Sequence, residues 1–174
     1  MHILNIYNFF ILYANKICME IRIDGWRSKL TFDASHFLPD YSKCSRLHGH
    51  TYAIHVIIKG EIKEGIVIDF RVVKKALKEI IEELDHKVII PMNGKLEIKE
   101  GEEIEVKYAG KRYVFPKEDC VFLPIYSSSA ENLANYILKK FLEKIDLENI
   151  FAIKLGIDEG YGQGAWTEWK KQSV

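Results

Sequence analysis

The chain has 174 residues, which is enough for one domain with a hydrophobic core but short of two. Hydrophobic residues make up 48% and charged residues 29%, and the 25 basic and 25 acidic residues cancel. This composition is typical of a globular protein and gives no reason to expect a nucleic-acid partner. Three cysteines without framework spacing (Cys18, Cys44 and Cys120) argue against a disulfide scaffold and for a reducing, cytoplasmic location.

The first eighteen residues differ from the rest. Their apolar run is too short and too polar to span a bilayer, and they lack the basic start and cleavage site of a signal peptide, so we expect no membrane partner. Met19 is followed at once by a strand-like segment. We therefore interpret residues 1–18 as an N-terminal extension that an upstream start site would produce, and residues 19–174 as a single domain. The alternative is that the extension packs on the body as an extra element.

Alternating apolar residues predict three strands in the first third of the chain. They are Ile21 and Ile23 in the first, Leu30, Phe32 and Ala34 in the second, and Tyr52, Ile54, Val56 and Ile58 in the third. The second strand reaches His36 on the face that carries Phe32. The segment between the second and third strands contains the turn formers Pro39, Asp40 and Ser42, which predict a loop.

Two helices and further strands follow. Residues 69–84 show a helical period that includes Val72 and Leu77, and Asp69 is a suitable N-cap. A second helix is predicted after Ser128, which forms a capping box with Glu131, and its apolar stripe is Leu133, Ile137, Phe141 and Ile145.

Residues 94–122 lie between the helices and predict a hairpin that turns at 109–110, and a last strand is expected at 151–157. Strands in hairpins with the helices gathered on one face predict an α+β layer fold with an antiparallel sheet.

The third strand begins at His48-Gly-His50. Two histidines at i and i+2 of a strand point to the same face, so both imidazoles can reach one ion. If the second and third strands pair, His36 arrives beside them, and three imidazoles suit Zn²⁺ with a fourth position left open. A pair of this kind by itself is often only a surface or core feature, and His55, on the other face, is interpreted as structural or solvent-facing.

Other polar residues are candidates for acid–base work. Cys44 lies four residues before His48, where a metal site could lower the pKa of its thiol, although an inert thiol is equally compatible. Asp85 could orient His86 for proton transfer, although a histidine at a helix C-terminus is also favoured by the helix dipole. Glu159 follows the last strand and could accept two hydrogen bonds from an amino-pyrimidinone edge, with Asp158 as a rival and a plain surface charge as the alternative.

Taken together, several segments resemble the 6-pyruvoyltetrahydropterin synthase/6-carboxytetrahydropterin synthase family. They are His36, the string Cys44-Ser-Arg-Leu-His48-Gly-His50, residues 65–70, Asp85-His86 and residues 130–134. The resemblance covers residues 20–170 and implies the tunnelling fold (T-fold), which assembles into trimers and often hexamers with active sites at subunit interfaces. Relative to compact members, residues 94–122 are an insertion.

The resemblance also implies a chemistry. It implies zinc on His36, His48 and His50, Cys44 as the general base, and Asp85 with His86 as a relay that a neighbouring subunit contributes. It implies a pterin-anchoring carboxylate, placed here at Glu159, and 7,8-dihydroneopterin triphosphate as the substrate.

Three residues separate Cys44 from His48, a short spacing similar to the branch that forms 6-carboxytetrahydropterin for 7-deazaguanine bases (preQ0, queuosine, archaeosine). A pyruvoyl-forming or aldolase-like enzyme and a non-catalytic zinc or pterin-binding protein are the alternatives. The chain departs from the family at Ser128-Ser129 and in lacking a threonine after Glu159.

Overall fold

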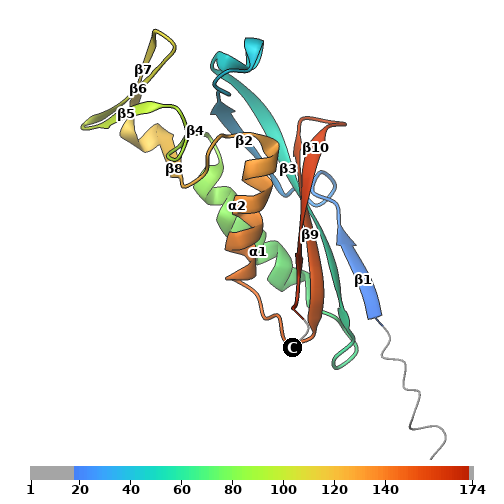
Figure 1. Cartoon of the computed structure of the whole chain (residues 1–174). Helices are drawn as coiled ribbons and strands as arrows, with labels where there is room; N and C mark the ends of the chain where they lie inside the picture. The colour runs from blue at the N-terminus through green and yellow to red at the C-terminus, as the bar shows by residue number, and fades with distance from the viewer. Residues whose placement is uncertain (1–17, 173–174) are drawn as a thin grey trace, which may run out of the picture.

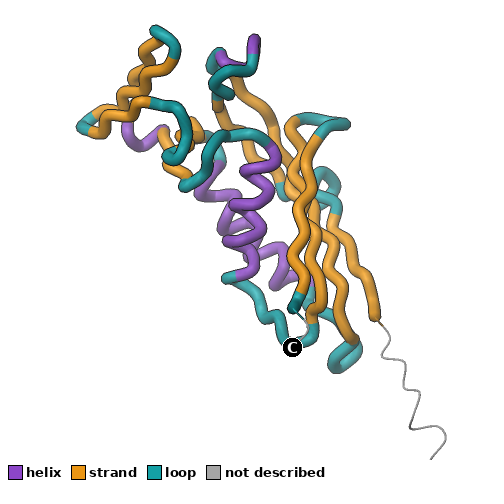
Figure 2. Tube along the Cα trace, in the orientation of Figure 1, coloured by secondary structure: helices purple, strands orange, loops and turns teal. Residues whose placement is uncertain are grey.

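The computed structural model describes residues 18–172, so the predicted N-terminal extension lies, apart from Cys18, outside the described residues. Figure 1 shows a long twisted sheet with two helices against one face. Figure 2 shows the same arrangement by type of element, with a small group of strands set apart at one end. Neither described helix is long and apolar enough to cross a membrane.

Seven strands form the main sheet, in the order β10-β9-β3-β2-β4-β8, with β1 paired to the second half of β3. Their bounds are β1 Cys18–Ile23, β2 Thr31–His36, β3 His48–Glu61, β4 Lys87–Pro91, β8 Cys120–Leu123, β9 Ile150–Glu159 and β10 Gly164–Lys170. The expected antiparallel pairing holds for β1, β2, β3, β9 and β10. The sequence pattern missed β4 and β8, which are short. β4 pairs with β2 and β8 pairs with β4, both in parallel.

The helices α1 (Phe70–Leu84) and α2 (Ala130–Leu142) cover one face of the sheet, as predicted. Asp69 caps α1 as expected, because its Oδ1 accepts a hydrogen bond from the backbone N–H of Arg71 at 2.7 Å. The predicted apolar stripe was wrong at Val72, which is exposed, while Val73 takes the buried position.

The predicted capping box of the second helix is also wrong. The N-cap of α2 is Ser129, whose side chain makes no capping hydrogen bond. Ser128 is fully buried instead, and its hydroxyl donates to the carbonyl of Phe37 at 3.2 Å. Its position one residue before the cap therefore ties the start of α2 to the chain that follows β2.

The segment between α1 and α2 contains the predicted hairpin and one strand more. The strands β5 (Glu97–Glu100), β6 (Glu103–Tyr108) and β7 (Lys111–Pro116) form a separate antiparallel sheet, which we call the inserted sheet. Ile104 and Val106 of β6 are fully buried against Phe37 and Ile90 of the main body. The inserted sheet therefore has an apolar core that it shares with the residue directly after β2.

Candidate functional site

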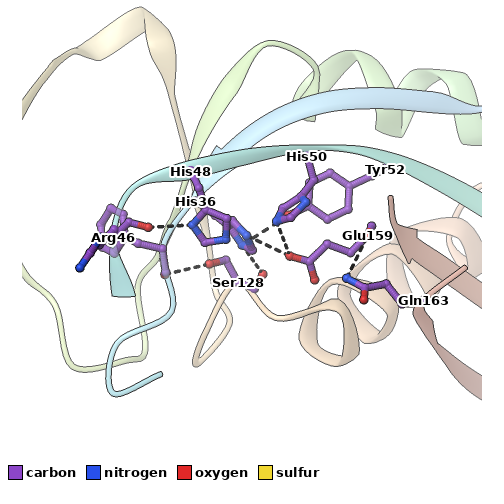
Figure 3. A network of polar contacts seen from close by, with 9 residues as sticks. His36, Arg46, His48, His50, Tyr52, Ser128, Glu159 and Gln163 are labelled. Carbon is purple, nitrogen blue, oxygen red and sulfur yellow. Dashed lines mark hydrogen bonds and ion pairs between the residues drawn. The ribbon is translucent and has the colours of Figure 1, made fainter. Parts of the chain in front are cut away.

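The three predicted histidines meet where β2 ends and β3 begins (Figure 3). In the antiparallel register, His36 lies opposite His48, and Ala34 lies opposite His50. The ring centroid of His36 is 4.5 Å from that of His48 and 5.3 Å from that of His50. The period of the strands thus brings all three imidazoles to one side, as the sequence predicted.

Backbone carbonyls fix the orientation of two of these rings. Nδ1 of His36 lies 2.9 Å from the carbonyl oxygen of Ser128, and Nδ1 of His48 lies 2.7 Å from that of Arg46. A carbonyl can only accept, so each Nδ1 carries a proton, and in the neutral form of the ring Nε2 then presents its lone pair. Metal-binding histidines are held in this way by an outer hydrogen bond to the ring nitrogen that faces away from the ion.

Glu159 completes the cluster. Its Oε1 lies 3.0 Å from Nε2 of His36 and 3.0 Å from Nε2 of His50. The first contact lacks hydrogen-bond geometry, so Nε2 of His36 is fully buried without a hydrogen-bond partner. A buried lone pair that faces a carboxylate oxygen is unfavourable unless a proton or a metal cation lies between them.

The charge states of His50 and Glu159 also favour a metal site. Burial lowers the pKa of His50, and the neighbouring His36 and His48 lower it further against the opposing effect of Glu159. Burial acts to raise the pKa of Glu159, but the three histidines outweigh it, and the pKa lies below its ordinary value. Neutral imidazoles and an ionised carboxylate are the forms that bind a metal ion. The ligand atoms of His36, His48, His50 and Glu159 lie within 4.8 Å of one another, so the three imidazoles could hold a metal ion with the carboxylate beside it.

A cavity of about 870 Å³ opens beside the cluster, and Glu159 lies on its wall. The first turn of α2 supplies Ala130, Glu131 and Asn132, and the turn before β10 supplies Gln163. Figure 3 shows Gln163 beside Glu159, where its side-chain amide donates to the Glu159 carbonyl at 3.2 Å. The volume is in the range of small-molecule sites.

Cys44 lies in the loop between β2 and β3, in a short 3₁₀ turn over Ser42–Ser45, and is exposed. Its backbone carbonyl accepts a hydrogen bond from Leu38 at 2.7 Å, which closes the loop. Among the described residues, its thiol is not part of the cluster that could hold a metal. The sequence prediction that Cys44 acts on a ligand of the metal therefore stays a prediction.

Asp85 and His86 form one unit, a point that the sequence left open. Oδ2 of Asp85 lies 2.9 Å from Nδ1 of His86, and its Oδ1 accepts from the backbone of Asp33 on β2 at 2.8 Å. The side chain of His86 is 79% exposed. This pair lies apart from the three-histidine cluster and presents an imidazole to the surface.

Asp158 belongs to a different network from Glu159. Its Oδ2 accepts a hydrogen bond from the indole of Trp26 at 2.8 Å and lies 3.1 Å from Nε2 of His55. Nδ1 of His55 accepts from the backbone of Gly25 at 3.1 Å. These contacts occupy Asp158 and give His55 a structural role, and of the two neighbouring carboxylates only Glu159 lines the cavity.

Some residues of the site could not be found by sequence reasoning. Ser128 and Arg46 act through backbone carbonyls, which carry no residue signature. The contact of Glu159 with the histidines follows from the pairing of β9 with β3, in which Glu159 lies opposite Tyr52. That long-range register is not readable from local pattern. For Glu131 and Asn132, the family motif at residues 130–134 was the available signal.

The fold and this site define an α+β scaffold in which two strands carry a three-histidine cluster, a candidate metal centre, beside a cavity. Residues 26–170 match the family described as 6-pyruvoyl tetrahydropterin synthase. The chain belongs to this family, whose members are enzymes that act on pterins, and it has the T-fold of the family.

Individual relatives support the assignment to this family. The chain is 37% identical over 156 residues to a putative 6-carboxy-5,6,7,8-tetrahydropterin synthase of Methanocaldococcus jannaschii, which covers 84% of this chain and 94% of that protein. It is 35% identical over 130 residues to the 6-carboxy-5,6,7,8-tetrahydropterin synthase of Aquifex aeolicus, which covers 70% and 75%. A catalytic-residue mutant of Plasmodium vivax 6-pyruvoyltetrahydropterin synthase superposes with a TM-score of 0.83 at 29% identity, over 89% of this chain and 99% of that one.

The cluster predicts how metal binding responds to mutation. In His50→Ala, one of the converging imidazoles is lost, and we expect metal affinity to fall by more than the roughly 10–100-fold typical of losing an outer partner. The bound metal is measured by mass spectrometry of elements after dialysis against a graded chelator. His55→Gln, in the same strand but outside the cluster, is the control and should retain metal. Equal retention by both variants would contradict the site.

Proposed function

We propose that the protein is a zinc-dependent 6-carboxy-5,6,7,8-tetrahydropterin synthase that acts on 7,8-dihydroneopterin triphosphate in the cytoplasm, on the way to 7-deazaguanine bases. The single observation that carries the proposal is the buried Nε2 of His36, which makes no hydrogen bond and lies 3.0 Å from the carboxylate of Glu159, a residue on the wall of the cavity. The names of the relatives from Methanocaldococcus jannaschii and Aquifex aeolicus support the carboxy-forming branch.

Zinc is proposed because three neutral imidazoles are a common catalytic zinc set that leaves a position open for a ligand. When bound, zinc would polarise the side-chain hydroxyls of the substrate and make the neighbouring protons easier to remove. The backbone carbonyls of Ser128 and Arg46 would hold the rings of His36 and His48 in the orientation that zinc binding needs.

The other residues would move protons and hold the substrate. Cys44 would take and return protons at the three-carbon side chain, and Asp85 would keep the proton of His86 on Nδ1 so that Nε2 can accept one. Glu159 would accept two hydrogen bonds from the amino-pyrimidinone edge of the pterin. Triphosphate would leave, and the bond between the first and second side-chain carbons would break to release acetaldehyde. One water would supply the missing oxygen of the carboxylate, and the electrons from oxidation of the first side-chain carbon would reduce the dihydropterin ring to the tetrahydro level.

Product identification tests this proposal. We expect the zinc-loaded protein to convert 7,8-dihydroneopterin triphosphate to 6-carboxytetrahydropterin and acetaldehyde, detected by mass spectrometry. Cys44→Ala should keep its zinc and lose turnover by roughly the 10²–10⁴-fold that one acid–base group contributes.

A pyruvoyl product would instead support the second candidate, which the description of the family and the name of the Plasmodium vivax structure favour. A hydroxymethyl pterin would indicate an aldolase-like reaction. Full biological function of Cys44→Ala would indicate a non-catalytic zinc or pterin-binding protein.

The carboxylate of Glu159 generates a second prediction. An amide has one acceptor oxygen where the carboxylate has two, and its NH₂ would face the donors of the pterin edge. We expect Glu159→Gln to raise KM roughly 10–100-fold, the loss typical of a hydrogen bond to a charged group, with zinc content unchanged. Glu168→Gln, on β10, is the matched control and should leave KM unchanged. Loss of zinc from Glu159→Gln would show that Glu159 is a metal ligand and not the pterin anchor.

Assembly is the third part of the proposal. The exposed Asp85–His86 pair lies outside the histidine cluster of its own chain, as expected for a group that serves the site of a neighbouring subunit. We expect the active protein to be a trimer or a hexamer. Sedimentation equilibrium at assay concentrations measures its mass, and a fully active monomer would contradict the shared site.

A further inference from the structure

The loop between β2 and β3 carries Cys44 and adopts a backbone that needs support. Asp40 and Ser42 have φ values of 72° and 40°, in the left-handed region that residues with a side chain adopt at a cost in free energy. Inside the loop, the hydroxyl of Ser45 donates to the carbonyl of Ser42 at 2.7 Å, and Leu38 donates to the carbonyl of Cys44. Two further backbone bonds, from Tyr41 to the carbonyl of Leu38 and from Arg46 to that of Lys43, complete the contacts inside the loop, and none of these four bonds involves Asp40.

The inserted sheet supplies contacts to the strained residue. The hydroxyl of Tyr108, at the end of β6, accepts a hydrogen bond from the backbone N–H of Asp40 at 2.7 Å and donates one to the Asp40 carboxylate. Lys95, just before β5, forms a hydrogen-bonded ion pair with the other carboxylate oxygen. Lys95 and Tyr108 together hold the pKa of the Asp40 carboxyl below its usual range.

This group of contacts differs from a single surface ion pair. An isolated exposed pair contributes little to stability, because two flexible side chains must be ordered to form it. Here the hydroxyl of Tyr108 makes two hydrogen bonds to the same residue, Asp40. It accepts one from the backbone N–H and donates one to the carboxylate. A second contact lies further along the loop, where Lys111 donates to the carbonyl of Ser45 at 3.4 Å.

The support is itself anchored to the site. The ring of Tyr113, on β7, stacks on Phe37 with centroids 5.3 Å apart and an interplanar angle of 15°. Phe37 is fully buried and directly follows the histidine at the end of β2. The inserted sheet thus contacts both ends of the active region, the residue after His36 and the loop with Cys44.

The contacts also border the candidate substrate cavity. Asp40 and Lys95 line the same cavity as Glu159, together with Leu38, Pro39 and Tyr41 of the loop. Any change in the position of Asp40 therefore moves a wall of that cavity as well as the turn that carries Cys44.

We propose that the inserted sheet, through Tyr108 and Lys95, acts as a clamp that fixes the loop of Asp40 and so positions the Cys44 thiol, which the same loop carries. Tyr108 and Lys95 are positioning residues, since they act through Asp40. That the clamp serves catalysis rests on the proposed function of Cys44. The existence of the clamp does not depend on that function.

The test compares Tyr108→Phe with Tyr113→Phe in the zinc-loaded full-length protein. The first change removes the hydroxyl that holds Asp40, and the second removes a hydroxyl of the same inserted sheet for which the described residues offer no hydrogen bond. Lys95→Gln, which removes the ion pair with Asp40, is a second variant that should loosen the same loop. Four quantities are measured: tryptic cleavage after Lys43 and Arg46, the rate of Cys44 alkylation mapped by mass spectrometry, zinc content, and kcat with KM.

We expect Tyr108→Phe to be cleaved in the loop about tenfold faster than the wild type, the factor typical of losing one hydrogen bond to a charged group, and to show an altered rate of Cys44 alkylation. We expect kcat to fall by about the same factor, with zinc content unchanged and KM within about twofold. Tyr113→Phe should match the wild type in all four measurements.

Two results would overturn the inference. Unchanged cleavage and alkylation in both Tyr108→Phe and Lys95→Gln would show that no clamp exists. A loosened loop with an unchanged kcat would show that the clamp does not position Cys44 for catalysis. If the wild type itself does not turn over the pterin, the proposed function fails, and cleavage and alkylation still decide whether the clamp exists.

Discussion

The antiparallel register of β2 against β3 is the constraint on which the site depends. It sets His36 opposite His48 and places His50 two residues further along the same face. A shift by one residue would send His48 and His50 to the other side of the sheet. The buried face of the sheet prevents such a shift, because Phe32, Tyr52 and Ile54 would leave the core. Core packing and metal-site geometry are therefore specified by the same alternation of side chains.

Local pattern was sufficient for much of this architecture. The period of two along 30–36 and 48–58 predicted both strands and the convergence of three histidines, and Asp69 was correctly predicted as a cap. Predictions failed where tertiary contacts override local preference. Ser128 looks like a helix cap, but its hydroxyl and carbonyl are used by Phe37 and His36.

The remaining gaps are long-range. The strands β4 and β8 join the sheet in parallel through crossovers, and β9 brings Glu159 to the histidines from more than a hundred residues away in sequence. Asp158 and Glu159 are adjacent carboxylates that the sequence could not tell apart, but successive residues of a strand face opposite sides of the sheet. Asp158 is held by Trp26 and His55, and Glu159 meets the cluster and the cavity.

X-ray absorption at the zinc edge of the metal-loaded protein tests the central claim most directly. The account predicts an imidazole-dominated shell of three nitrogen ligands at about 2.0–2.1 Å, with no sulfur at about 2.3 Å, because the thiol of Cys44 stays outside the ligand set. A sulfur ligand, or a shell of oxygen atoms without the scattering pattern of imidazole rings, would contradict it. The histidines at the start of β3 would then need another explanation.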